Sequence, residues 1–110
     1  MTERRACPRV RVSLAALYDS DVWPRPRVVS VVDLSTAGVR LETTPYSLSP
    51  DEELEISFVL HSRAIKCKGK VIHVQDLSYG KQEAGIRFEE LSEEDKHHIE
   101  TCISQQSRPP

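Results

Sequence analysis

Arginines are concentrated at the start of the chain. Residues 3–11 read ERRACPRVR and contain Arg4, Arg5, Arg9 and Arg11 against a single acid. A guanidinium group is planar, always charged and carries a fork of donors, so it fits a phosphate or the O6 and N7 edge of guanine and can stack on a base. A run of like charges is also commonly a solvated tail, and composition alone favours that simpler interpretation.

A second candidate for chemistry is the segment DLSTAG at residues 33–38. Asp33 follows a run of β-branched residues, Ser35 can hydrogen bond to nearby backbone amides, and Gly38 permits a positive φ or a close approach. An aspartate carboxylate accepts two hydrogen bonds, which matches the N1–H and N2–H₂ donors of guanine. An Asx turn without a ligand explains the same residues, and for this segment alone we prefer it.

Alternating apolar residues predict six strands that would position these two segments. Prolines and other turn residues predict loops at 19–26 and 45–51 and turns at 61–63 and 76–81. A break in the alternation predicts a β-bulge near Gly69. The predicted strands are residues 9–14, 27–33, 39–42, 53–60, 65–74 and 84–88.

The end of the chain changes to a helical pattern. Ser92 followed by Asp95 resembles a capping box, and Ile99, Cys102 and Ile103 form one apolar stripe. Six short strands and one helix predict a mainly β fold, a six-stranded antiparallel β-barrel with one C-terminal α-helix. We expect a flexible arginine-rich arm at 1–8, the barrel and helix at 9–105, and a tail at 106–110.

Length and composition exclude several classes of protein. The chain has 110 residues, 38% hydrophobic and 29% charged, which is typical of one globular domain. No apolar run approaches the length of a membrane helix, and three widely spaced cysteines without an export signal favour a cytoplasmic protein. His98 and Cys102 are four residues apart on the predicted helix, but no further motif supports a metal site, so we expect none.

The two segments are far more specific together than apart. Arg-x-x-x-Arg before the first strand and Asp-x-Ser-x-x-Gly after the second resemble the signature of the PilZ domain family. ERRACPRVRV and VVDLSTAGVRLET carry the resemblance, and later strands and the closing helix also fit, over residues 3–105. PilZ domains are bacterial receptors for the second messenger cyclic di-GMP, built on a six-stranded barrel.

The resemblance implies a role for each motif residue. Arg5 and Arg9 would bind the phosphates and the guanine Hoogsteen edge and stack on the bases. Asp33 would pair with a guanine edge, Ser35 would bond to a phosphate or guanine, and Gly38 would let the ligand approach the barrel. In the family, a basic residue at the position of Arg4 accompanies a ligand dimer, which favours two ligand molecules per chain.

The function expected from these residues is a cyclic di-GMP receptor that orders its arginine-rich arm on binding and signals to an unidentified effector protein. A nucleotide-independent adaptor of the same fold is the alternative. A small RNA-binding barrel fits poorly because the net charge is −2 and the strands lack interleaved aromatic residues. We expect no enzyme activity, no cofactor, no nucleic-acid polymer and no membrane partner.

Overall fold

The computed structural model of the chain describes residues 9–20, 26–45, 47–77 and 79–107. In these ranges six antiparallel strands close into a barrel in the order β1-β2-β3-β6-β5-β4, and one helix follows. This confirms the predicted fold class. The elements are β1 (Val10–Ser20), β2 (Arg27–Leu34), β3 (Gly38–Thr43), β4 (Glu53–Leu60), β5 (Arg63–Leu77), β6 (Lys81–Glu90) and α1 (Glu93–Ser107).

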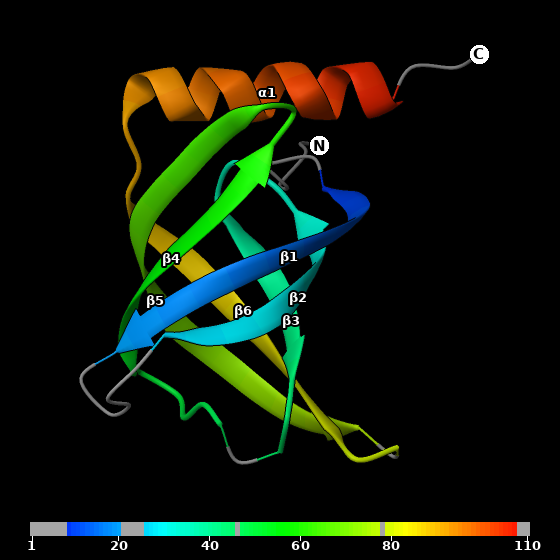
Figure 1. Cartoon of the computed structure of the whole chain (residues 1–110), viewed down its shortest axis with the longest axis vertical. Coiled ribbons are helices and arrows are strands. Elements are labelled where there is room, and N and C mark those ends of the chain that lie inside the picture. Colours follow the sequence, from blue (N-terminus) through cyan, green and yellow to red (C-terminus); the bar gives the residue numbers. More distant parts are fainter. Residues whose placement is uncertain (1–8, 21–25, 46, 78, 108–110) are drawn as a thin grey trace, which may run out of the picture.

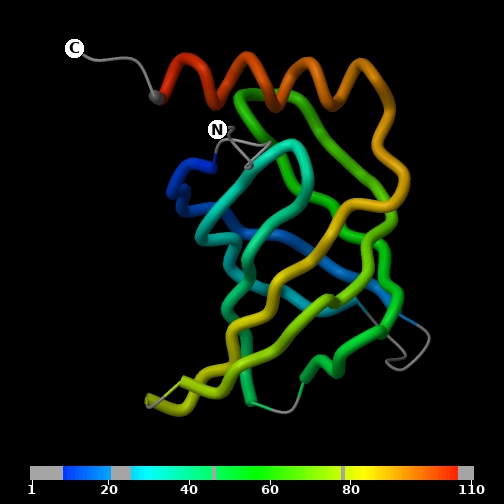
Figure 2. Tube along the Cα trace, turned by 180° about the vertical axis from the view of Figure 1, so that it is seen from behind, coloured from blue at the N-terminus to red at the C-terminus, as the bar shows by residue number. Residues whose placement is uncertain are grey.

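The helix and one long hairpin lie at opposite ends of the barrel. Figure 1 shows α1 lying across one end, while the β5–β6 hairpin extends beyond the other. Seen from behind in Figure 2, the turn between β2 and β3 lies at the helix end of the barrel. The second motif, DLSTAG, therefore lies at the helix end of the barrel wall.

Several strands extend further than the sequence pattern predicts. β1 continues to Ser20 because Asp19 and Ser20 pair with Glu55 and Leu54 of β4. β5 continues to Leu77, which pairs with Lys81, so the β5–β6 turn is shorter than expected. The helix reaches Ser107 rather than ending by residue 105. Cross-strand pairing, which a single strand's pattern does not report, accounts for both strand extensions.

The core is formed by the inward side of the barrel and the underside of α1. Tyr18, Ile56 and Ile65 are among its largest fully buried side chains. The helix contributes the apolar stripe predicted from the sequence, with all three of its members buried: Ile99, Cys102 and Ile103. Burial of this stripe closes the end of the barrel and accounts for most of the stability of a helix this short.

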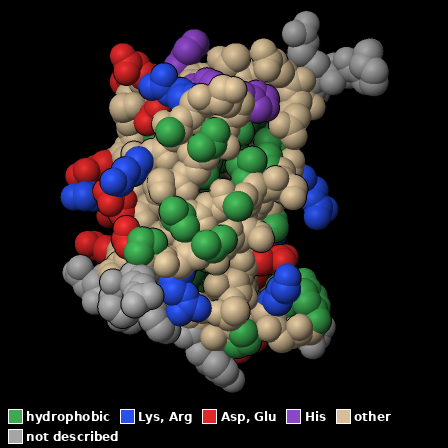
Figure 3. Space-filling model, in the orientation of Figure 1, with side chains coloured by type: hydrophobic (Ala, Val, Ile, Leu, Met, Phe, Trp, Pro, Cys, Tyr) green, Lys and Arg blue, Asp and Glu red, His purple; other side chains and the backbone are tan. Residues whose placement is uncertain are grey.

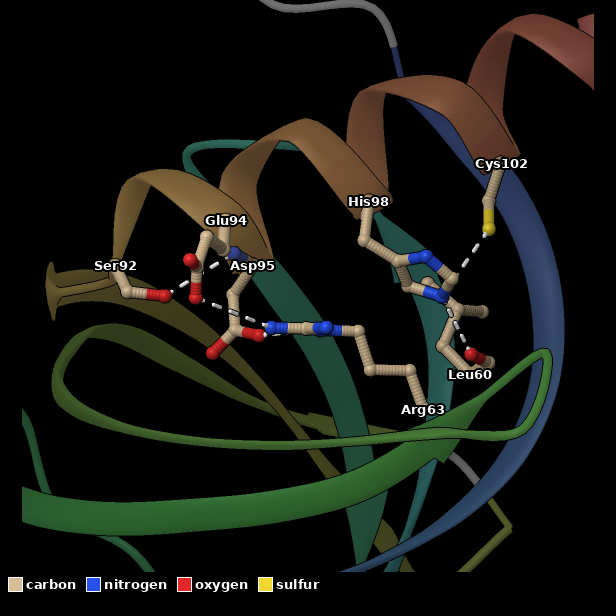
Figure 4. Close-up of polar contacts among 7 residues, drawn as sticks. All are labelled: Leu60, Arg63, Ser92, Glu94, Asp95, His98 and Cys102. Carbon is tan, nitrogen blue, oxygen red and sulfur yellow. Dashed lines mark hydrogen bonds and ion pairs between the residues drawn. The ribbon is translucent and has the colours of Figure 1, made fainter.

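Polar contacts fix the first half of α1 on the β4–β5 hairpin (Figure 4). The backbone N–H of Asp95 donates to Ser92 Oγ at 3.0 Å, which confirms the predicted N-cap. Arg63 Nε donates to Asp95 Oδ1 at 2.8 Å. His98 Nε2 lies 2.7 Å from the carbonyl oxygen of Leu60, so this nitrogen must carry the proton.

One face of the barrel carries exposed apolar residues. Leu17, Val28 and Val59 are 45%, 70% and 59% exposed and come from β1, β2 and β4. Figure 3 shows hydrophobic side chains in the middle of this face. In the part of the chain that the structure describes, no helix is both long enough and apolar enough to span a bilayer.

Candidate ligand-binding site

A β-bulge in β2 turns Asp33 to the outside of the barrel. Val31 pairs with Leu41 and Asp33 pairs with Arg40, so Val32 is an extra residue between the two pairs. Val31 and Leu34 are both buried, and without the extra residue the alternation would direct Asp33 inward. The bulge therefore presents a carboxylate on the outer wall next to the β2–β3 turn.

Asp33 is held by an ion pair with its cross-strand neighbour. Arg40 Nη2 lies 2.9 Å from Asp33 Oδ2, and Arg40 Nη1 lies 3.8 Å from Glu83 Oε1. The Asp33 side chain is only 14% exposed and that of Arg40 is 34% exposed. The Arg40 guanidinium therefore lies between the carboxylates of Asp33 and Glu83, and its ion pair with Asp33 limits the rotation of the Asp33 side chain.

Ser35 organises the turn that follows Asp33. Its hydroxyl accepts hydrogen bonds from the backbone N–H groups of Ala37, at 3.1 Å, and Gly38, at 3.2 Å. Its own N–H donates to the carbonyl of Gly38 at 2.9 Å. Because Ser35 is buried and its hydroxyl is engaged inside the turn, its observed role is to shape the loop. The ligand bond that the resemblance implies stays a prediction.

Gly38 is required by the neighbouring strand. It begins β3 and pairs with Arg87 of β6. A Cβ at this position would overlap the carbonyl oxygen of Ile86 and lie 3.1 Å from the Cα of Arg87. The close approach expected from the sequence is thus present, and the group that approaches is the backbone of β6. The ligand approach implied by the resemblance remains a prediction.

A concave surface brings the two sequence motifs together. It encloses about 400 Å³ and is lined by Arg9, Asp33, Ser35 and Gly38. Arg9 is exposed and immediately precedes β1. Arg4 and Arg5, and with them the predicted arm at 1–8, lie outside the described residues. Four of the six predicted site residues therefore meet at one surface, although they come from positions 9 to 38 of the chain.

The same surface contains polar residues that the sequence reasoning missed. They come from β3, which begins with the last residue of the second motif, and from β5 and β6. The signal for Arg40 was present, because it lies two residues after Gly38 on the polar phase of its strand. No local pattern marks the residues from β5 and β6, since only the barrel pairing brings them here. The missed polar residues are Arg40, His73, Gln75, Glu83 and Arg87.

Two other candidates from the sequence have structural roles. His98 donates to the Leu60 carbonyl, and Cys102 Sγ lies 3.2 Å from His61 Nδ1 and 3.8 Å from His98 Nε2. Among the described residues, no group of three or more His, Cys, Asp or Glu side chains is arranged to hold a metal ion. Burial, with smaller contributions from Asp95 and Glu55, raises the pKa of the Cys67 thiol to about 12, so it stays neutral at physiological pH.

Comparisons with known proteins agree on one fold. The sequence model of the PilZ domain family matches residues 3–105. No curated protein matches the chain in sequence. The inhibitor of motility MotI (DgrA) from Bacillus subtilis superposes with a TM-score of 0.84 at 18% identity, covering 98% of this chain and 55% of that one.

Two further solved structures hold a ligand, cyclic di-GMP. The PilZ domain of YcgR from Escherichia coli gives a TM-score of 0.76 at 12% identity, with 94% of this chain and 91% of that one covered. The complex of MrkH from K. pneumonia gives 0.76 at 19% identity, with 96% and 52% covered. The chain thus spans about half the length of MotI and MrkH. At these low sequence identities, the superpositions show that the proteins share a fold.

Proposed function

The chain belongs to the PilZ domain family, and from that premise we propose that it is a receptor for cyclic di-GMP that signals to an effector protein. The observation that carries this proposal is the concave surface where both motif segments meet. Arg9 from the start of the barrel and Asp33 from the end of β2 line the same wall. Structures of YcgR and MrkH with cyclic di-GMP support the choice of ligand.

The chemistry of the surface suits a guanine nucleotide with phosphates. Cyclic di-GMP carries two guanine bases and two phosphodiesters. The Asp33 carboxylate accepts hydrogen bonds from the N1–H and N2–H₂ of one guanine. The ion pair with Arg40 fixes the position of that carboxylate before the ligand binds. Arg9, together with Arg4 and Arg5 of the arm, supplies positive charge to the phosphates and planar groups to the bases. We therefore propose that this surface binds the ligand and catalyses no reaction.

Ligand binding orders the arginine-rich arm against the barrel in this proposal. Four arginines within nine residues repel one another, and two phosphates offset that repulsion. We expect cyclic di-GMP to slow the exchange of backbone amide hydrogens at residues 1–10. Hydrogen exchange followed by mass spectrometry measures this directly, with the β4–β5 hairpin as an internal reference. Identical exchange of these residues with and without ligand contradicts the ordering step.

An effector protein completes the proposed signalling role. The exposed residues Leu17, Val28 and Val59 lie on β1, β2 and β4, away from the β5–β6 part of the ligand surface, and offer apolar area for a protein contact. A nucleotide-independent adaptor would use the same area. The two functions differ in whether the protein binds cyclic di-GMP at all.

Isothermal titration of cyclic di-GMP into the wild-type protein and an Arg9→Ala variant tests the proposal. We expect saturable binding by the wild type and an affinity about 10- to 100-fold lower in the variant. The variant loses one charge-assisted hydrogen bond, worth roughly 1.5–3 kcal/mol. Arg9 is exposed, so its removal leaves the barrel intact.

Lys66→Ala is the matched control. Lys66 is an exposed cation of β5 that does not line the concave surface. Its removal changes the net charge equally, so we expect an affinity within about twofold of the wild type. Equal losses in both variants would indicate a general charge effect. No binding by the wild type would favour the nucleotide-independent adaptor.

A further inference from the structure

Four residues form one row across the outer wall of the barrel. Asp33 of β2 pairs with Arg40 of β3, Arg40 pairs with Gly85 of β6, and Gly85 pairs with His73 of β5. All four line the concave surface. The proposed function already uses the first half of this row, and the second half lies further from the motif residues.

A second β-bulge directs His73 onto this wall. Val71 pairs with Ile86 and His73 pairs with Gly85, so Ile72 is an extra residue in β5. Val71 is fully buried, and strict alternation would bury His73 as well. Instead Ile72 and His73 are both exposed. Bulges that redirect a side chain are frequent beside functional sites, and the bulge at Val32 redirects Asp33 in the same way.

Gly85 provides the seat for the His73 ring. A Cβ on Gly85 would lie 2.5 Å from His73 Cε1 and 2.8 Å from Nδ1. The imidazole therefore occupies the space that a side chain at position 85 would fill. Gly85 is buried beneath it, whereas His73 itself remains exposed to the concave surface. The ring is supported from below and accessible from above.

We propose that His73, seated on Gly85, is a stacking platform for a guanine base of the ligand. This inference rests on the proposed cyclic di-GMP function and assigns that site a residue outside its two sequence motifs. An imidazole ring offers an aromatic face, and stacking of a base on such a face is sequence-tolerant and favourable. Asp33 then selects guanine at one end of the row while His73 provides surface at the other.

Titration of cyclic di-GMP into four variants tests the platform. We expect His73→Ala to weaken binding about 10-fold and His73→Phe, which keeps an aromatic face, to remain within about threefold of the wild type. Gly85→Ala displaces the ring and should weaken binding several-fold. Because the added methyl meets only the end of a side chain, the barrel tolerates it. The double variant His73→Ala/Gly85→Ala should bind like His73→Ala alone.

His97→Ala, which removes an exposed histidine of α1 outside this surface, is the control and should leave the affinity unchanged. Wild-type affinity in His73→Ala overturns the platform but leaves the proposed receptor function standing. A loss in His73→Phe as large as in His73→Ala overturns stacking, and further weakening in the double variant shows that the methyl group blocks the ligand itself. No binding by the wild type overturns both the platform and the receptor function.

Discussion

Gly38→Ala should destabilise the barrel by about 3 kcal/mol or more, which is the largest loss of folding free energy we expect from a single methyl group in this chain. The new Cβ would overlap the Ile86 carbonyl oxygen and crowd the Cα of Arg87. Both contacts are with backbone, so no side-chain rotation relieves them. β3 must move away from β6, and the hydrogen bonds between these two strands weaken as a result.

Urea unfolding followed by circular dichroism measures this loss. Gly80→Ala is the informative control, because Gly80 has a φ of 79° but nothing lies within 4 Å of its Cβ position. There the cost is backbone strain alone, about 1–2 kcal/mol. A Gly38→Ala variant no less stable than Gly80→Ala would show that β3 and β6 do not approach as closely as described.

The Gly38 result bears on how the second motif works. Ser35 closes the turn from Asp33 to Gly38 through its hydrogen bonds to the backbone. The end of the turn packs directly against the backbone of β6, because Gly38 has no side chain. Two of the three motif residues therefore shape the backbone. Asp33 is the one whose side chain faces the concave surface with a charge to offer.

The fold could be predicted because its signals are local. Period-two alternation identifies each strand, and turn residues separate them. The helix follows from the Ser92 cap and from the apolar stripe that ends at Ile103. Strand ends were harder to predict, because Ser20 and Leu77 belong to strands only through their partners on β4 and β6.

The bulges could be predicted only in part. The break in alternation within residues 65–74 predicts a bulge near Gly69, and the extra residue of β5 is Ile72. The register shift at Gly69 itself places an extra residue in β6, and a further bulge lies at Val32 of β2. The extra residues Val32 and Ile72 each follow a buried valine. Because either residue of such a pair could face the core, the hydrophobic pattern does not show which one is the extra residue.

The residues of the candidate site also differ in whether the sequence alone could identify them. Arg9, Asp33, Ser35 and Gly38 stand in motifs with fixed spacing, so the sequence identifies them. Arg40, Glu83 and His73 share the wall only because strands distant in sequence are paired in a particular register. Because bulges set that register, the row could not be assembled from one strand's pattern at a time.

The largest loss of ligand affinity is expected from Asp33→Ala. The carboxylate that receives two guanine donors is removed, and with roughly 1.5–3 kcal/mol for each charge-assisted hydrogen bond the affinity for cyclic di-GMP should fall at least about 100-fold. The loss of folding free energy should be smaller than for Gly38→Ala, because the Arg40 guanidinium is partly exposed and keeps Glu83 as a partner. Asp76→Ala, at an exposed acid of β5 outside the concave surface, is the matched control.

Base selectivity separates a base-reading carboxylate from a general electrostatic effect. Adenine lacks the N1–H and N2–H₂ donors, so the wild type should prefer cyclic di-GMP over cyclic di-AMP, and Asp33→Ala should remove most of that preference. A purely electrostatic role predicts the reverse direction for affinity: removing a negative charge beside two phosphates would tighten the binding of both nucleotides. Competitive titration with the two ligands therefore decides between the two roles, because removing a carboxylate that reads guanine must lower the affinity for cyclic di-GMP far more than the affinity for cyclic di-AMP.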